Sequence, residues 1–194
     1  MRHARIALAA AALLQVAALA AAAAPEIGAP APDFRLQTID GKDFSLAEAA
    51  KSHKAVVVMF IATKCPYSNA YNDRMRDLAA AYGKQGVLFV GINSNKTEPL
   101  AEVVAHAKEH GHVFPIMKDP DNKVADLYDA RHTPEIYVVD PSGKLRYHGR
   151  IDENYEDASK VTSPDLKNAL DDLLANRQIA KAETKAFGCS IKRV

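Results

Sequence analysis

Apolar residues concentrate in two near-continuous runs, at 55–61 and at 86–93. A run of this length without polar alternation is typical of a central strand that is covered on both faces. Between the runs, apolar positions recur with helical spacing and predict a helix over 66–82 that ends near Gly83. The pattern therefore predicts a strand–helix–strand unit.

Shorter patterns flank this unit. The turn Asp40-Gly41 predicts an N-terminal hairpin, and Ser45 begins a capping box that opens a short helix to about Lys51. Further elements are expected as a helix over 97–110, an extended piece at 114–117, a helix at 122–129, strands at 136–139 and 144–149, and a helix from 162 or 163 to 176. The order predicts an α/β fold, a three-layer α/β/α sandwich with a mixed central sheet and an N-terminal β-hairpin.

Composition narrows the functional classes. The chain has 194 residues, 48% of them hydrophobic and 25% charged, which is enough for one well-cored domain. The formal net charge of +1 gives no indication of a nucleic-acid-binding surface or of a strongly membrane-attracted one.

The first 24 residues have the order of a signal peptide. A positive start at 2–5 precedes an apolar stretch at 6–20 and small residues at 21–24. We expect an exported bacterial protein, periplasmic or secreted, without stable membrane insertion after cleavage near Pro25. A membrane anchor is the alternative interpretation of this stretch. We divide the remainder into a domain at 25–176 and a C-terminal tail at 177–194.

Cys65 is the main candidate for chemistry. It lies where the first apolar run ends and the helix begins, with Pro66 at the first helical position. The helix N-terminus and the neighbouring Lys64 favour a thiolate, so we expect the pKa of this thiol to be lowered. A buried structural cysteine is the alternative.

Cys189 is the only other cysteine. Two cysteines are too few for a disulfide scaffold, but export permits a bond between them. Three outcomes remain open from the residues: a bond within the chain, a bond between two subunits, and a tail cysteine that never meets Cys65.

Several motifs together give the chain a family resemblance. It resembles the thioredoxin fold and, within it, the peroxiredoxin-like redoxins related to alkyl hydroperoxide reductase and thiol-specific antioxidant proteins. The motifs are Cys65-Pro66-Tyr67-Ser68, Gly91-Ile92-Asn93-Ser94-Asn95, Thr133-Pro134, Asp140-Pro141-Ser142-Gly143-Lys144, Gly149-Arg150-Ile151-Asp152 and the ending from Glu183 to Lys192.

The resemblance implies a thiol-dependent oxidoreductase that needs no cofactor. Cys65 would attack a peroxide or a disulfide, Cys189 would resolve the product, and an outside thiol would reduce the protein again. Pro134 would follow a cis peptide bond, and Thr133 would offer its backbone to a substrate strand near Cys65. In this picture the tail is free to move when the protein is reduced. The substrate-contacting residues would be Thr63, Pro66, Arg131, Thr133 and Pro134.

Two departures separate this chain from its relatives. A thioredoxin dithiol motif would have cysteine where Ser68 stands. A typical peroxiredoxin has a hydroxyl residue and an arginine where this chain has Ala62 and Pro134. Thr63 and Arg131 are the nearest substitutes in sequence, so the choice between peroxidase and disulfide exchange stays open.

A binding protein is the alternative from another functional class. Such a protein would use the thioredoxin fold to hold copper or a partner protein through Cys65. Three histidines, His106, His110 and His112, have a spacing that permits metal binding, but a solvated helix face is the simpler interpretation and we expect no metal. His132 next to Thr133 is expected near the thiol or in an exposed loop.

Overall fold

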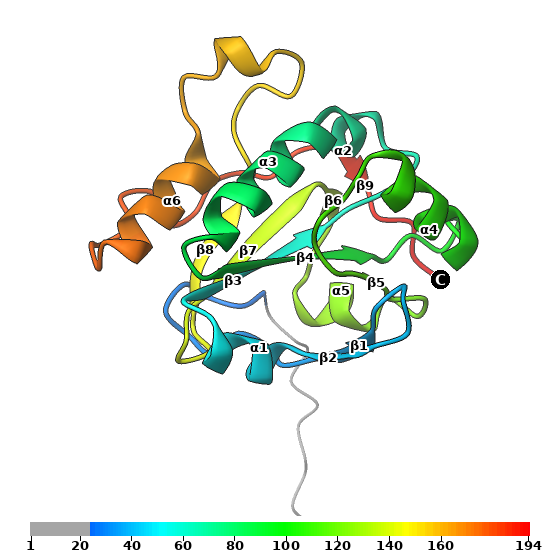
Figure 1. Ribbon diagram of the computed structural model, residues 1–194, viewed down its shortest axis with the longest axis horizontal. Coiled ribbons are helices and arrows are strands. Elements are labelled where there is room, and N and C mark those ends of the chain that lie inside the picture. The colour runs from blue at the N-terminus through cyan, green and yellow to red at the C-terminus, as the bar shows by residue number, and fades with distance from the viewer. Residues whose placement is uncertain (1–23) are drawn as a thin grey trace, which may run out of the picture.

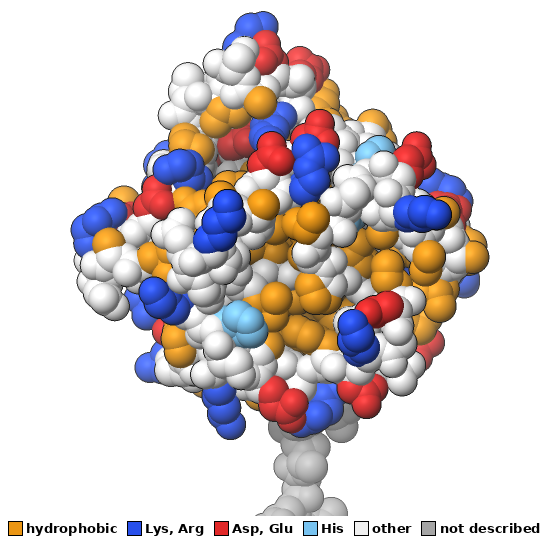
Figure 2. Space-filling view, in the orientation of Figure 1, with side chains coloured by type: hydrophobic (Ala, Val, Ile, Leu, Met, Phe, Trp, Pro, Cys, Tyr) orange, Lys and Arg blue, Asp and Glu red, His pale blue; other side chains and the backbone are white. Residues whose placement is uncertain are grey.

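The computed structural model of the protein describes residues 24–194 (Figure 1). The candidate signal segment, residues 1–24, lies outside the described residues except for Ala24. Within the described part, no helix has both the length and the apolar character needed to span a bilayer. Basic and acidic side chains are interspersed over the face drawn in Figure 2, in keeping with the small net charge.

A mixed five-stranded sheet forms the centre of the molecule, in the order β5-β4-β3-β7-β8. Strand β3 is parallel to β4 and antiparallel to β7. All six residues of β3 are buried, as expected for a run without polar alternation. The strands are β3 (Ala55–Phe60), β4 (Val87–Asn93), β5 (Ile116–Lys118), β7 (Glu135–Val139) and β8 (Leu145–Gly149).

Helices cover both faces of this sheet and complete the expected three-layer sandwich (Figure 1). Alternate β3 side chains point to opposite cores: Val57 and Met59 face one, Val56 and Val58 the other. The first core is closed by α3 (Asn72–Gly83), α4 (Leu100–Glu109) and α6 (Asp165–Leu174), and the second by α1 (Leu46–Ser52) and α5 (Lys123–Leu127).

The N-terminal hairpin and the Ser45 cap of the following helix are confirmed, while the Glu48 carboxylate bonds Arg35 and does not complete the capping box. Strands β1 (Arg35–Gln37) and β2 (Asp43–Ser45) pair antiparallel, and the Ser45 hydroxyl accepts a hydrogen bond from the Glu48 amide.

The helix expected over 66–82 is interrupted. It divides at Tyr71 into α2 (Pro66–Ala70) and α3. Tyr71 is buried, and its hydroxyl donates to Asp152 at 2.7 Å. This bond joins two residues that are 81 positions apart in sequence. Helical periodicity is a local signal, so it could not reveal the break.

The C-terminal tail is packed against the domain. Its β9 (Cys189–Ser190) pairs antiparallel with β6 (His132–Thr133), and Ile179 and Ile191 are buried. Neither β6 nor β9 was expected from periodicity, because each has only two residues. A short 3-10 helix, η1 (Ala158–Lys160), was also not expected. Both cysteines are free thiols in this structure, and the movement of the tail in the reduced protein stays a prediction.

His112 lies just after α4, and its side chain is partly buried. Its ring stacks on Phe114 with centroids 5.0 Å apart, and Nε2 lies 3.2 Å from the Asn72 side-chain oxygen. Burial, followed by the nearby His106 and His110, lowers the pKa of His112 to about 4. His112 in the folded protein therefore binds a proton only at a lower pH than in the unfolded chain, where its pKa is near the ordinary value.

We expect the free energy of unfolding to fall as the pH is lowered from 6.5 to 4.5. In this window the unfolded chain binds a proton at position 112 that the folded chain does not bind, and most carboxylates are still ionised. His112→Gln should show a shallower pH dependence in urea unfolding. A residual slope from His106 is expected, because its pKa is lowered as well. Identical slopes for the two proteins would contradict the assignment.

Candidate active site

Cys65 lies at the N-terminus of α2. It follows the end of β3, at the carboxyl edge of the sheet. Its side chain is 3% exposed. The Ser68 amide donates to Sγ at 3.4 Å, and the thiol donates to the Thr133 carbonyl at 3.1 Å. The Thr133–Pro134 bond is cis, as the resemblance implied, and the expected contact between Thr133 and the Cys65 turn is confirmed.

Cys189 comes to the same residue, Thr133, from the tail. In the β6–β9 pair, Cys189 stands opposite Thr133, which places both cysteines next to one residue. Burial, and next the interaction with Cys65, raise the pKa of the Cys189 thiol to about 11. Cys189 is therefore a poor nucleophile while Cys65 is reduced and next to it.

Gly188 makes this approach sterically possible. Its φ is +142°, and a Cβ at this position would lie 2.1 Å from the Thr133 carbonyl oxygen. A side chain there would push the tail strand off β6. Gly188 was not among the residues singled out from the sequence. A glycine directly before a cysteine was the only available signal.

Ser68 occupies the position of the second cysteine in a dithiol motif. It is fully buried, and its hydroxyl accepts a hydrogen bond from the Ala62 amide at 3.1 Å. Ser68 therefore fixes the turn between β3 and α2. The second thiol of the site comes instead from Cys189, more than 120 residues away in sequence.

Thr63 and Lys64 both bond to one carboxylate on α4. The Thr63 hydroxyl donates to Glu102, and the Lys64 ammonium lies 2.7 Å from the other Glu102 oxygen. Lys64 and then Thr63 hold the pKa of Glu102 below its ordinary value. The charge of Lys64 is therefore balanced by a carboxylate, which weakens any influence it has on Cys65.

Arg131 and His132 precede the Thr133 carbonyl, but their side chains bond elsewhere. The Arg131 guanidinium is exposed and bonds Asp129 at 2.8 and 3.1 Å. His132 lies 3.9 Å from Glu135, whose carboxylate also accepts the backbone amides of Arg131 and His132. The structure brings Thr133 and Pro134 to Cys65 and directs Arg131 towards Asp129.

An aromatic cluster joins the active turn to the tail. The Tyr67 ring lies 4.4 Å from Tyr155 and 6.2 Å from Phe187, centroid to centroid. Phe187 directly precedes Gly188, so these contacts hold the tail beside α2. The aromatic partners of Tyr67 thus belong to the same chain.

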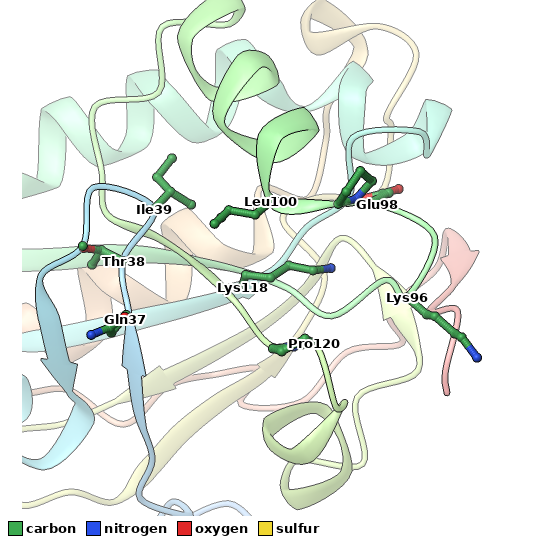
Figure 3. Close-up of a pocket in the computed structure, with 10 residues that line it drawn as sticks. Gln37, Thr38, Ile39, Lys96, Glu98, Leu100, Lys118 and Pro120 are labelled. Carbon is green, nitrogen blue, oxygen red and sulfur yellow. The ribbon is translucent and has the colours of Figure 1, made fainter.

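A cavity of ≈530 Å³ lies between the N-terminal hairpin turn, the loop before α4 and β5 (Figure 3). Lys96, Glu98 and Lys118 line it, and neither cysteine does. In the described part of the chain, no group of three or more His, Cys, Asp or Glu side chains is arranged to hold a metal ion. The ring centroids of His106 and His110 lie 4.3 Å apart with the rings tilted by 49°, and His106 Nε2 bonds the Asn69 side chain.

The sheet order, the flanking helices and a cysteine bonded to the carbonyl that precedes a cis proline define a thioredoxin-fold redoxin. Residues 27–148 match the AhpC/TSA family, and the chain belongs to that family.

Known proteins support this assignment. A solved structure of a hypothetical protein from Sinorhizobium meliloti is 33% identical, with a TM-score of 0.80 over 89% of this chain and 97% of that one. The thiol-disulfide oxidoreductase ResA of Geobacillus thermodenitrificans is 30% identical over 62% of this chain and 67% of its own length. The thiol:disulfide interchange protein DsbE of Escherichia coli is 30% identical over 66% of this chain and 67% of its own length. The chain thus spans about two thirds of these two curated relatives.

Gly188→Ala should displace β9 from β6, because an added methyl group has no room beside the Thr133 carbonyl. We expect the rate of Cys65 alkylation by iodoacetamide to rise on the order of tenfold, since local opening would expose the thiol. Peptide mass spectrometry gives this rate. Gly143→Ala is the matched control, because φ is +77° there and nothing lies within 4 Å of the added Cβ. Equal Cys65 alkylation in both variants would refute this role for Gly188.

Proposed function

We propose that the protein is a thiol-disulfide oxidoreductase in which Cys65 is the nucleophile and Cys189 the resolving thiol. The observation that carries the proposal is that both cysteines lie next to Thr133. Cys65 bonds its carbonyl, and Cys189 is its partner in the β6–β9 pair. The names of the ResA and DsbE relatives support the reaction class.

The proposed reaction has two steps. Together they exchange the substrate disulfide for a disulfide within the protein. The Cys65 thiolate attacks one sulfur of a substrate disulfide, forms a mixed disulfide and releases the other substrate sulfur as a thiol. Cys189 then loses its proton and attacks the Cys65 sulfur. The Cys65–Cys189 disulfide forms, and the second substrate thiol leaves. An outside thiol reductant returns both cysteines to the reduced state.

The pKa of Cys189 gives these steps their order. Part of its rise comes from Cys65, and this part disappears once Cys65 is bonded to substrate sulfur. Cys189 therefore becomes easier to deprotonate when a mixed disulfide is present for it to attack. Burial is the larger cause of the raised pKa, and it remains and favours the protonated thiol of Cys189.

Peroxide reduction is the second candidate, and the match to the AhpC/TSA family favours it. Cys65 would then become a sulfenic acid with release of an alcohol or water, and Cys189 would form the disulfide with loss of water. The hydroxyl of Thr63 bonds Glu102 and the guanidinium of Arg131 bonds Asp129. Because both groups are occupied away from the thiol, we place disulfide exchange first.

The proposal also covers the organisation of the chain and its location. Residues 25–176 would form the redoxin domain, and residues 177–194 the tail that brings Cys189 to it. The candidate signal segment supports an exported protein, in a compartment where disulfides form and persist.

Stopped-flow reaction with a small aromatic disulfide and, separately, with hydrogen peroxide tests this function. We expect Cys65→Ser to lose the fast reaction by at least about a hundredfold, because the nucleophile is gone. Cys189→Ser should keep the first step and accumulate a stable mixed disulfide, seen by mass spectrometry. The unsubstituted protein should end as an intramolecular disulfide.

Other outcomes separate the alternatives. A fast first step that depends on Cys189 and not on Cys65 would reverse the assigned roles. A peroxide reaction faster than the disulfide reaction would move the second candidate to first place. Covalent dimers on non-reducing gels would indicate that Cys189 bonds a second subunit.

A further inference from the structure

Glu98 is a buried carboxylate beside the active turn. It lies just before α4 (Figure 3) and is 2% exposed. Its two oxygens accept the backbone amides of Thr63 at 2.8 Å and Lys64 at 3.1 Å. These are the two residues directly before Cys65, so Glu98 fixes the backbone that leads into the nucleophile.

Two side-chain amides complete the shell of Glu98. Asn93 donates to it at 2.5 Å and Asn95 at 3.0 Å. The Lys118 ammonium in turn bonds the Asn93 side-chain oxygen and the Asn95 carbonyl at 2.7 and 2.6 Å. A buried carboxylate with four donors is fully satisfied and therefore held in one position.

Asn95 extends this network to the tail. Its side-chain oxygen accepts the Lys192 amide at 2.7 Å, and the Lys96 amide donates to the Lys192 carbonyl at 2.8 Å. Lys192 lies three residues after Cys189. One amide side chain thus joins the carboxylate that holds the Cys65 turn to the strand that carries Cys189.

We propose that Glu98 and Asn95 form a positioning relay that sets the distance and orientation between Cys65 and Cys189. The inference rests on the proposed function and assigns these residues to its second step. Attack on an outside disulfide needs Cys65 alone. Closure of the Cys65–Cys189 bond needs both sulfurs held together, and such positioning raises the effective concentration of one thiol near the other.

The test equilibrates reduced protein with buffers of reduced and oxidised glutathione. The ratio of intramolecular disulfide to glutathione mixed disulfide, read by mass spectrometry, gives the effective concentration of Cys189 at Cys65. We expect Asn95→Ala to lower it about tenfold or more. The rate of Cys65 attack on oxidised glutathione, measured with Cys189→Ser present, should change by less than about threefold.

Glu98→Gln is the second variant. It replaces one acceptor oxygen of the carboxylate with an amide NH₂ group, and this donor then faces a backbone N–H that is also a donor. It should act in the same direction as Asn95→Ala, with thermal unfolding confirming that each variant is folded. Arg193→Ala is the control. Arg193 bonds Asp126 and the Ala130 carbonyl, so it anchors the tail without contacting Glu98.

An unchanged effective concentration in Asn95→Ala overturns the relay and leaves the proposed function standing. An equal loss in Arg193→Ala and Asn95→Ala also overturns it, because general tail anchoring would then explain the result. If the unsubstituted protein forms no Cys65–Cys189 disulfide at all, the proposed function fails together with the relay.

Discussion

The carbonyl of Thr133 is the point on which the thiol site depends. It accepts the Cys65 thiol, and the tail passes so close to it that only glycine fits at position 188. Cys189 is paired with the same residue. Since a strand pair fixes side-chain direction as well as distance, this single backbone position defines how two cysteines from opposite ends of the domain meet.

Two buried carboxylates hold the loops on either side of that point. Glu98 accepts amides from the turn before Cys65, and Glu135 accepts the amides of Arg131 and His132 before Thr133. Burial alone would raise the pKa of Glu135, but His148 and these amides hold it below its ordinary value. The turn before Cys65 lacks a regular hydrogen-bond ladder, so there a charged acceptor with backbone donors takes the place of secondary structure.

The reduced protein combines a thiol that has to react with a site that is nearly closed. Cys65 is 3% exposed, covered by a tail held through Ile191 in the core and Phe187 beside Tyr67. A two-residue strand pair adds little stability of its own, so these tail contacts largely determine how often the site opens. Closure shields the Cys65 thiol from solvent, and in the proposed reaction it would keep Cys189 next to the mixed disulfide.

The layered α/β fold and the location of Cys65 could be predicted from the sequence, because long buried runs, a helix cap at Ser45 and a proline at a helix start are local signals. The resemblance added the cis bond before Pro134. Only the tertiary structure decided that Tyr71 divides a helix, that Gly188 lies against Thr133, and that the tail carries Cys189 to the site. Those features depend on contacts between residues far apart in sequence, and neither a two-residue strand nor a single buried carboxylate has a period that a sequence pattern can reveal.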